Sequence, residues 1–163
     1  MTKLEAQHVW DVIDKQQFAV LGMVTLQHAA RTVGIVYIID KHRLYISSHK
    51  DAWKVRHIAQ NPYVSLTVPI SKRIPFLPFI KIPAATVTFS AEARILKSAD
   101  VSLRIRKRLY RQRADDQQLL AETAIIEVMP HGEFLTYGIG MPVWQMADTK
   151  KARGRVSIAT RAS

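Results

Sequence analysis

YISSHKDAWKVRHIAQNPYVSLTV, residues 45–68, is the stretch of this chain that decides the fold. It begins at the end of a β-rich run and offers two adjacent hydroxyls, those of Ser47 and Ser48. Asp51 can cap a helix that Asn61-Pro62 stops, because a residue before proline disfavours the α conformation. The run over 63–68 has the apolar content of a buried strand. The stretch therefore predicts a strand, a turn, a short basic helix and a second strand in immediate succession.

The turn between the first strand and the helix is suited to an anion. A strand that delivers hydroxyls and lysines to a helix N-terminus forms a phosphate pocket, since the free N–H groups and the helix dipole both favour negative charge there. The alternative is an ordinary capped surface helix with no ligand. The local residues alone leave both interpretations open.

The residues before this stretch predict a helix followed by an antiparallel meander. Thr2 and Glu5 form a capping box, and apolar residues recur at helical spacing, so we expect an amphipathic helix over residues 3–16. Three β-rich runs follow, separated by short polar breaks, at residues 18–27, 32–40 and 43–48. Tight links between consecutive strands imply antiparallel pairing.

The residues after the stretch predict a covered loop, a long strand and a basic helix. Prolines and large apolar residues alternate over residues 69–83, which excludes a central strand and indicates a loop lying over the core, against a partner subunit or as a lid on a ligand. The alternating pattern over 84–96 predicts a strand with one buried face. Ser98 can cap a helix that runs to about Arg113. Further strands are expected at residues 124–129 and 133–137.

The composition indicates one domain of a protein without disulfides. At 163 residues the chain is long enough for a single core, and we expect a domain over residues 1–146 followed by a basic C-terminal tail over 147–163. Cysteine is absent from the sequence, which fits a reducing cytoplasm. The longest apolar run, residues 18–26, is too short to span a bilayer, and the histidines lack metal-binding spacing. We therefore expect a cytoplasmic protein with no membrane span and no metal site.

The formal net charge of +11 favours anionic partners. Part of it comes from the helix predicted after residue 98, whose outward face carries Arg104, Lys107, Arg108 and Arg111. Such an array can contact nucleic-acid phosphates, but the segment has a single aromatic residue and no recognition motif. A basic nucleic-acid-binding protein without catalysis is therefore one alternative function, and a solvated helix face is the simpler explanation.

The sequence shows no familiar catalytic constellation. It contains neither the G-x-S-x-G serine motif nor a P-loop nor the Rossmann glycine fingerprint. If the protein is an enzyme, a bound cofactor carries the chemistry while the protein supplies position and electrostatics.

The order of the segments forms a pattern that extends beyond the opening stretch. It runs through FAVLGMVTL, RLYISS and KDAWKVRHIAQNPYVSLTV, in which Lys54–Leu66 follows the form K-x-x-x-I/L-x-x-N-P-x-V-S-L. This order resembles the pyridoxamine 5′-phosphate oxidase-like, FMN-binding split-barrel family over about residues 18–96, and more weakly through IIEVMP and YGIG. The resemblance implies a mainly β (α+β) fold. We expect a six-stranded antiparallel split β-barrel of Greek-key type, with an N-terminal helix, a short helix after strand 3 and a longer basic helix after strand 5.

The resemblance also implies a homodimer that holds FMN in the groove between its subunits. The FMN phosphate would lie near the third strand and the helix that follows it. Ser48 stands where the family has a phosphate-binding Ser or Thr, and Lys54 where it has a phosphate-binding lysine. Hydrogen bonds to a charged group of this kind contribute about 1.5–3 kcal/mol each.

Two positions depart from the pattern of the pyridoxamine-phosphate oxidases. Trp53 stands where they carry a phosphate-binding arginine, and Thr32 where their second strand supplies another arginine. Arg31 and Lys50 are near enough in sequence to substitute, although neighbouring residues of a strand point to opposite faces. Trp53 can lie against a ring or simply pack. With Ser47, these residues complete the expected cofactor site.

The expected function is that of a flavoprotein rather than of a true pyridoxamine-phosphate oxidase. The R-L-A-P ending that those oxidases use for their substrate is missing from this chain, so we do not expect pyridoxine 5′-phosphate synthesis. We expect an oxidoreductase in which FMN exchanges a hydride with an unidentified small-molecule substrate, with no catalytic residue assigned to the protein. The same fold with haem or a deazaflavin in place of FMN is the second alternative.

Overall fold

The computed structural model describes residues 4–71, 85–142 and 145–158. Thr2 of the predicted capping box, most of the proline-rich segment and the last residues of the predicted tail lie outside the described residues.

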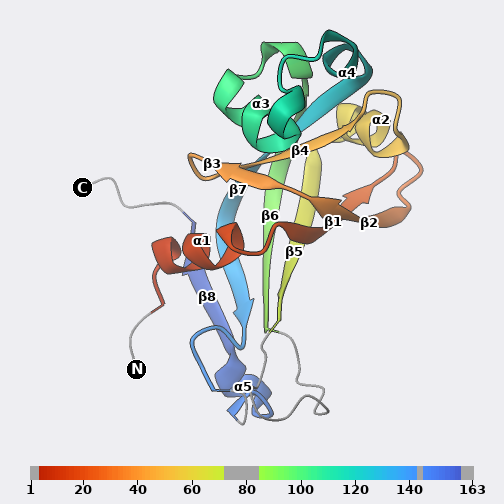
Figure 1. Cartoon of the computed structure of the whole chain (residues 1–163). Helices are drawn as coiled ribbons and strands as arrows, with labels where there is room; N and C mark the ends of the chain where they lie inside the picture. Colours follow the sequence, from red (N-terminus) through yellow and green to blue (C-terminus); the bar gives the residue numbers. More distant parts are fainter. Residues whose placement is uncertain (1–3, 72–84, 143–144, 159–163) are drawn as a thin grey trace, which may run out of the picture.

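The described residues form a mainly β protein with several helices (Figure 1). The helices are α1 (Ala6–Asp14), α2 (Trp53–Gln60), α3 (Leu103–Tyr110), α4 (Gln117–Glu122) and α5 (Thr149–Ala152), with short 3₁₀ turns η1 (Ser98–Asp100) and η2 (Arg111–Arg113). The strands are β1 (Phe18–Val24), β2 (Ala30–Val36), β3 (Ile38–Asp40), β4 (Arg43–His49), β5 (Tyr63–Ile70), β6 (Ala85–Lys97), β7 (Thr123–Tyr137) and β8 (Arg153–Ser157).

All of these strands belong to one antiparallel sheet. The order across the sheet is β2-β1-β5-β6-β7-β4-β3, and β8 pairs with the second half of β7. The sheet curls into an open half-barrel, with α1 lying across it and α2, α3 and α4 gathered at one end (Figure 1). This arrangement confirms the predicted antiparallel, mainly β fold.

The curl of the sheet depends on the single residue that separates β2 from β3. These two strands lie at opposite ends of the strand order, yet only Tyr37 stands between them in the chain. The Tyr37 ring is buried, its hydroxyl donates to the Ile13 carbonyl at 2.6 Å, and its N–H donates to the Gln17 carbonyl at 3.1 Å. Burial, with a smaller effect of the Asp14 carboxylate, raises the pKa of this hydroxyl, so it remains a proton donor.

The main core fills the concave face of the sheet, which we call the inner face. Alternate residues of each strand point to it, as the pleat requires, and α1 packs Val9, Trp10 and Ile13 onto it. Phe134 of β7 makes edge-to-face contacts with Trp10 and with Phe89 of β6. Helix α2 closes one end of this core with Val55 and Ile58.

Among the described residues, helices cover the opposite, outer face of the sheet at one end only. There α3 packs Ile105 against Tyr45 of β4 and Ile125 of β7, and Val101 completes this second apolar cluster. The chain from η1 to α4, residues 98–122, therefore forms a helical insert on the outer face.

Next to the insert, the outer face carries a buried carboxylate. Glu127 of β7 is 3% exposed and accepts hydrogen bonds from Arg43 and Tyr45 of β4, each at 2.9 Å, and from Arg94 of β6. Burial by itself raises the pKa of Glu127, but the hydrogen bonds from Arg94, Arg43 and Tyr45 outweigh it and hold the pKa below its ordinary value. The cluster ties three neighbouring strands together.

The strand boundaries differ from the sequence prediction in three places. The predicted strand 32–40 is split at Tyr37, and residues 153–157, expected in the tail, form β8. The sheet of the described residues therefore has eight strands, where six were expected. Pro130 was expected to stop a strand, but β7 continues through it. The physical reason is that β4 pairs only as far as Val128 and β8 only from Glu133, so the proline ring, which has no N–H to donate, lies where β7 has a neighbour on one side alone.

The basic helix also differs from the prediction. The predicted continuous helix from Ser98 to Arg113 is broken after η1, where Val101 adopts an extended conformation and is buried, and Ser102 instead caps α3 through Ile105 N–H. Arg111, with φ of 53°, ends α3, and α4 starts afresh after Asp116. Burial of Val101 therefore decides the start of the helix in place of the local capping signal.

The hydrogen bonds of Glu127 should make the free energy of unfolding depend on pH in the acid range. Because the folded-state pKa lies below the ordinary value of about 4.5, the stabilisation is present above that pH and is lost as the pH falls through the lower, folded-state pKa. Glu127→Gln should lower the free energy of unfolding at pH 7 by about 1–3 kcal/mol and flatten its dependence on pH below 5. Urea unfolding at pH 3.5–7 measures both effects. Glu133→Gln, in an exposed pair with Arg155, is the control, and an equal flattening in that variant would contradict the assignment.

Candidate phosphate-binding site

The turn from β4 into α2 places one buried hydroxyl without a partner. Ser48 lies opposite Ala124 of β7, and its side chain shares the inner face with the core residues Leu44 and Ile46. It is 7% exposed, and its Oγ has no hydrogen-bond partner in the described structure. A buried unsatisfied hydroxyl costs about 1–3 kcal/mol, so a ligand oxygen that accepts from it restores a lost interaction.

The N-terminus of α2 lacks a side-chain cap. Asp51 was expected to supply one, but the N-cap residue is Ala52, and no acidic residue lies in the first turn. The backbone N–H of Asp51 donates to His49 Nδ1 at 3.2 Å. Within the described residues, no side chain therefore accepts a hydrogen bond from the first N–H groups of α2, and the dipole of the helix favours an external anion.

Two cationic side chains belong to this end of α2. Lys54 is the second residue of the helix and is half-buried. Arg31 of β2 lies over the ring of Trp53, with its Cζ 5.9 Å from the ring centroid. A guanidinium from a distant strand thus reaches the first residue of α2 through a cation–π contact.

The strand register explains why Arg31, and not Thr32, faces this site. Arg31 lies opposite the buried Met23 of β1, and directly opposed residues of an antiparallel pair share a face. Thr32 lies opposite Gly22 and shares the outer face with it. The two neighbours therefore point in opposite directions, and Thr32 is not brought to the α2 turn.

The other two predicted residues are held by the helical insert. Ser47 Oγ donates to the Tyr110 hydroxyl at 3.0 Å, and Lys50 Nζ donates to the Ala121 carbonyl at 3.0 Å. Of the seven predicted site residues, Ser48 lies near the end of β4, Trp53 and Lys54 are the first two residues of α2, and Arg31 contacts the Trp53 ring. The structure turns Ser47 and Lys50 toward the insert.

One further residue of this region, His57, was not predicted from the sequence. His57 stands four residues after Trp53, and its ring meets the Trp53 ring edge-on with centroids 5.7 Å apart. Its Nδ1 is buried without a hydrogen-bond partner in the described structure. The spacing of four residues on a helix was the signal that could have identified this pair.

The basic residues of the insert are largely engaged within the protein. Arg104 pairs with Asp40, and Arg108 donates to the Ile39 carbonyl and lies 3.9 Å from the Asp14 carboxylate. Arg106 lies 3.5 Å from Asp115. These contacts fasten α3 to β3 and its surroundings, so part of the positive charge that suggested nucleic acid serves the fold.

The described residues form neither a membrane-spanning helix nor a metal-binding cluster. None of their helices is both long and apolar enough to cross a membrane. Within the same residues, no group of three or more His, Asp or Glu side chains is placed to hold a metal ion.

The curled antiparallel sheet with a helix after its fourth strand defines a split-barrel protein. The family model for pyridoxamine 5′-phosphate oxidase matches residues 6–137, and the chain belongs to this family. The resemblance found in the sequence is thereby confirmed. No curated protein matches the chain significantly.

Solved structures share the fold at low sequence identity. The haem storage protein HutZ from Vibrio cholerae is 15% identical, with 85% of this chain and 98% of that chain covered and a TM-score of 0.63. An FAD-binding protein from Mesorhizobium loti is 16% identical, with 78% and 88% covered and a TM-score of 0.59. An F420 reductase is 16% identical, with 76% and 93% covered and a TM-score of 0.54. The fold is therefore shared by proteins named for flavin, deazaflavin and haem.

The unpartnered hydroxyl gives a stability prediction for the protein without ligand. Ser48→Ala removes a buried polar group that has no partner, so the melting temperature should stay the same or rise. Ser47→Ala is the matched control, because it breaks the bond to Tyr110 and should lower the free energy of unfolding by about 1 kcal/mol. Thermal and urea unfolding of both variants test the pair. A clear loss of stability in Ser48→Ala would show that its hydroxyl is satisfied within the protein.

Proposed function

We propose that this protein is an FMN-binding flavoprotein that carries out a redox reaction on a small molecule. The observation that carries the proposal is the buried, unpartnered Ser48 hydroxyl at the end of the strand leading into an uncapped helix N-terminus. A phosphate fits both features, since its oxygens accept hydrogen bonds and its charge is favoured by the helix dipole. Membership of the family supports FMN as the source of that phosphate.

In this proposal the positive charge comes from Lys54 and Arg31. The pyridoxamine-phosphate oxidases carry an arginine where this chain has Trp53. Arg31 supplies the guanidinium here and is held in place by lying over the Trp53 ring. Trp53 thus does not contact the phosphate itself, as the arginine of the oxidases does, but positions the guanidinium of Arg31 from β2.

Bound FMN supplies the hydride or electron transfer, and the residues of this chain hold and orient it. Ser48 and the first N–H groups of α2 would donate to the phosphate, while Lys54 and Arg31 balance its charge. The substrate and a cytoplasmic location remain predictions from the sequence.

Two other cofactors are candidates for the same site. The structural neighbours include a haem storage protein and an F420 reductase, so haem and a deazaflavin are the competing cofactors. Their absorbance spectra differ from that of FMN, and titration of the purified protein with each in turn separates the three. Tightest binding of haem would replace the flavin proposal with a haem-binding function.

Lys54 gives the direct test of the cofactor site. We expect purified protein to be yellow or to take up added FMN, and Lys54→Ala to weaken FMN binding about tenfold or more, as the loss of one charged hydrogen bond implies. Quenching of flavin fluorescence measures the dissociation constant. Lys107→Ala, an exposed lysine of α3, is the control and should bind FMN normally. A colourless protein that also fails to bind added FMN refutes the proposal.

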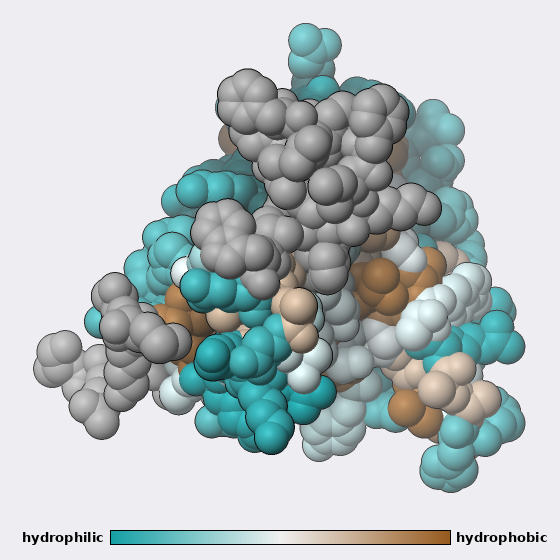
Figure 2. All heavy atoms as spheres, turned by 90° about the horizontal axis from the view of Figure 1, so that it is seen from below, coloured by the Kyte–Doolittle hydropathy of each residue, from teal (hydrophilic) through white to brown (hydrophobic). Residues whose placement is uncertain are grey.

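We also propose that the protein is a homodimer formed through the uncovered part of the outer face. Across β2, β1, β5 and the first half of β6, the strand register identifies the residues that point outward. They include the exposed apolar side chains of Phe18, Val24, Val36 and Tyr63, with Val36 68% and Tyr63 67% exposed. Hydrophobic residues also reach the surface in the view from below, mainly on the side where β1, β2 and β5 lie in Figure 1 (Figure 2).

This face carries few charged residues, which favours a second copy of the same chain as its binding partner. Among the described outward-facing residues of these strands as far as Glu92, only Glu92 is charged, although the chain as a whole is strongly basic. Exposed apolar patches on a folded protein mark interaction sites, and a face of this kind can pair with itself about a twofold axis.

The dimer interface is tested by placing a charge on it. Tyr63→Asp should convert the dimer to a monomer in light scattering coupled to size-exclusion chromatography, because an unpaired carboxylate would be buried at the contact. Leu103→Asp is the matched control, since Leu103 is also exposed, at 42%, but lies on α3 outside this face. A monomeric unmodified protein, or a dimer that survives Tyr63→Asp, would contradict the proposed interface.

A further inference from the structure

A groove of about 510 Å³ lies where the helical insert meets the α2 turn. Its walls come from four parts of the chain, namely the α2 turn and helix, the end of β6 with η1, helix α4, and the start of β7. The volume falls within the range of about 300–1,000 Å³ that is typical of small-molecule sites. None of the four residues gathered at the phosphate-binding site lines it.

The lining of the groove is apolar in its interior and positive in charge. Val55, Leu96, Leu120 and Ala124 supply apolar surface from four different elements, while Lys50 and Lys97 supply two ammonium groups. No Asp or Glu is among the described residues that line the groove. By contrast, the neighbouring cavity of about 410 Å³ on the other side of Leu96 and Lys97 contains Asp100 and Glu127. The 510 Å³ groove is therefore the one that suits an anion.

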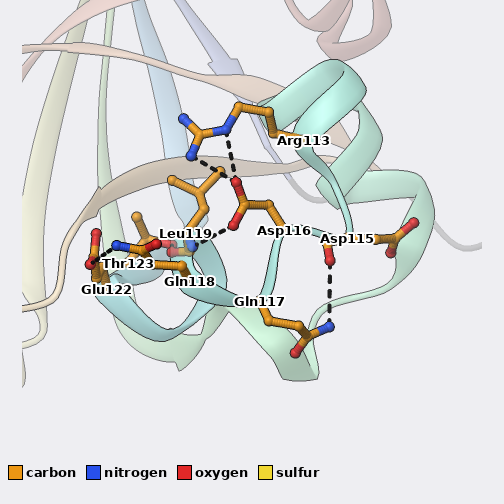
Figure 3. Close-up of polar contacts among 8 residues, drawn as sticks. All are labelled: Arg113, Asp115, Asp116, Gln117, Gln118, Leu119, Glu122 and Thr123. Carbon is orange, nitrogen blue, oxygen red and sulfur yellow. Dashed lines mark hydrogen bonds and ion pairs between the residues drawn. The ribbon is translucent and has the colours of Figure 1, made fainter.

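The walls of the groove are held in place before any ligand arrives. Asp116 caps α4 by accepting from Leu119 N–H at 3.0 Å, and Arg113 donates to the same carboxylate at 2.8 and 3.0 Å (Figure 3). The Leu119 N–H and then Arg113 hold the pKa of Asp116 below its usual range, so the cap persists in mild acid. The Thr123 hydroxyl forms hydrogen bonds with the hydroxyls of Ser98 at 2.8 Å and of Tyr110 at 3.0 Å. Binding therefore needs little ordering of the protein.

One of the two lysines is also fixed. Lys50 Nζ donates to the Ala121 carbonyl at 3.0 Å, and Lys50 N–H donates to the Glu122 carbonyl at 3.0 Å. An ammonium group has three N–H donors, so the bond to Ala121 leaves two for a ligand.

We propose that this groove is a second ligand site, which binds a small amphipathic carboxylate. The carboxylate pairs with Lys50 and Lys97, and the apolar part of the molecule lies along Val55, Leu96 and Leu120. The groove shares no lining residue with Ser48, Trp53, Lys54 and Arg31, and the proposal does not depend on flavin binding.

Octanoate is the probe, and methyl NMR of the full-length protein is the readout. We expect the methyl signals of Val55, Leu96 and Leu120 to shift in a saturable manner, while those of Leu103, on the exposed side of α3, stay unchanged. Octan-1-ol, with the same chain and no charge, should bind at least tenfold more weakly. Equal binding of the alcohol, or shifts confined to exposed residues such as Val36, would overturn the proposal.

Variants of the groove complete the test. Lys97→Gln should weaken octanoate binding about tenfold, whereas Lys107→Gln on α3 should not change it. Ala121→Phe places a bulky side chain in the groove from the surface of α4 and should abolish binding while the melting temperature shows that the protein is folded. If octanoate and FMN compete, both bind at one site and the proposal of a second site is overturned. If the protein binds octanoate but not FMN, only the proposed flavoprotein function is contradicted.

Discussion

The structure depends on the burial of Tyr37. The chain leaves β2 at one end of the strand order and joins β3 at the other end with this single residue between, so the sheet must curl for both strands to pair. The hydroxyl bond to Ile13 and the backbone bond to Gln17 fix the crossing against the end of α1. The curl creates the enclosed inner face on which the main core packs. It also brings β2 to the side of α2, where Arg31 meets Trp53.

The helical insert shows how the same charges can serve the fold or a ligand. Arg104 and Arg108 face carboxylates and a carbonyl of the β3 region, so their positive charge is balanced within the molecule. Lys50 and Lys97, fewer in number, line a groove without a carboxylate. Net charge therefore describes the long-range field, while the neutralisation of each side chain by its neighbours decides where an anion can bind.

The site could be predicted where its residues are consecutive in the chain. The order of hydroxyls, turn and basic helix pointed to the turn from β4 into α2, and the family resemblance added Ser48, Trp53 and Lys54, which follow one another there in the chain. The choice between Arg31 and Thr32 needed the pairing of β2 with β1, since a shift of one residue reverses the face of every side chain. Asp51 was also expected to cap α2, but the N-cap position falls on Ala52, one residue later in the chain.

The sequence by itself determined the antiparallel, mainly β character of this protein, its family and the turn between β4 and α2, because these follow from local patterns of hydrophobicity, turns and spacing. The tertiary structure decided the strand count, the curl of the sheet and the positions of the cations. The break at Tyr37, the passage of β7 through Pro130 and the start of α3 after Val101 all arise from burial or pairing with distant segments. Such contacts join residues that are far apart in the chain, so no local pattern records them.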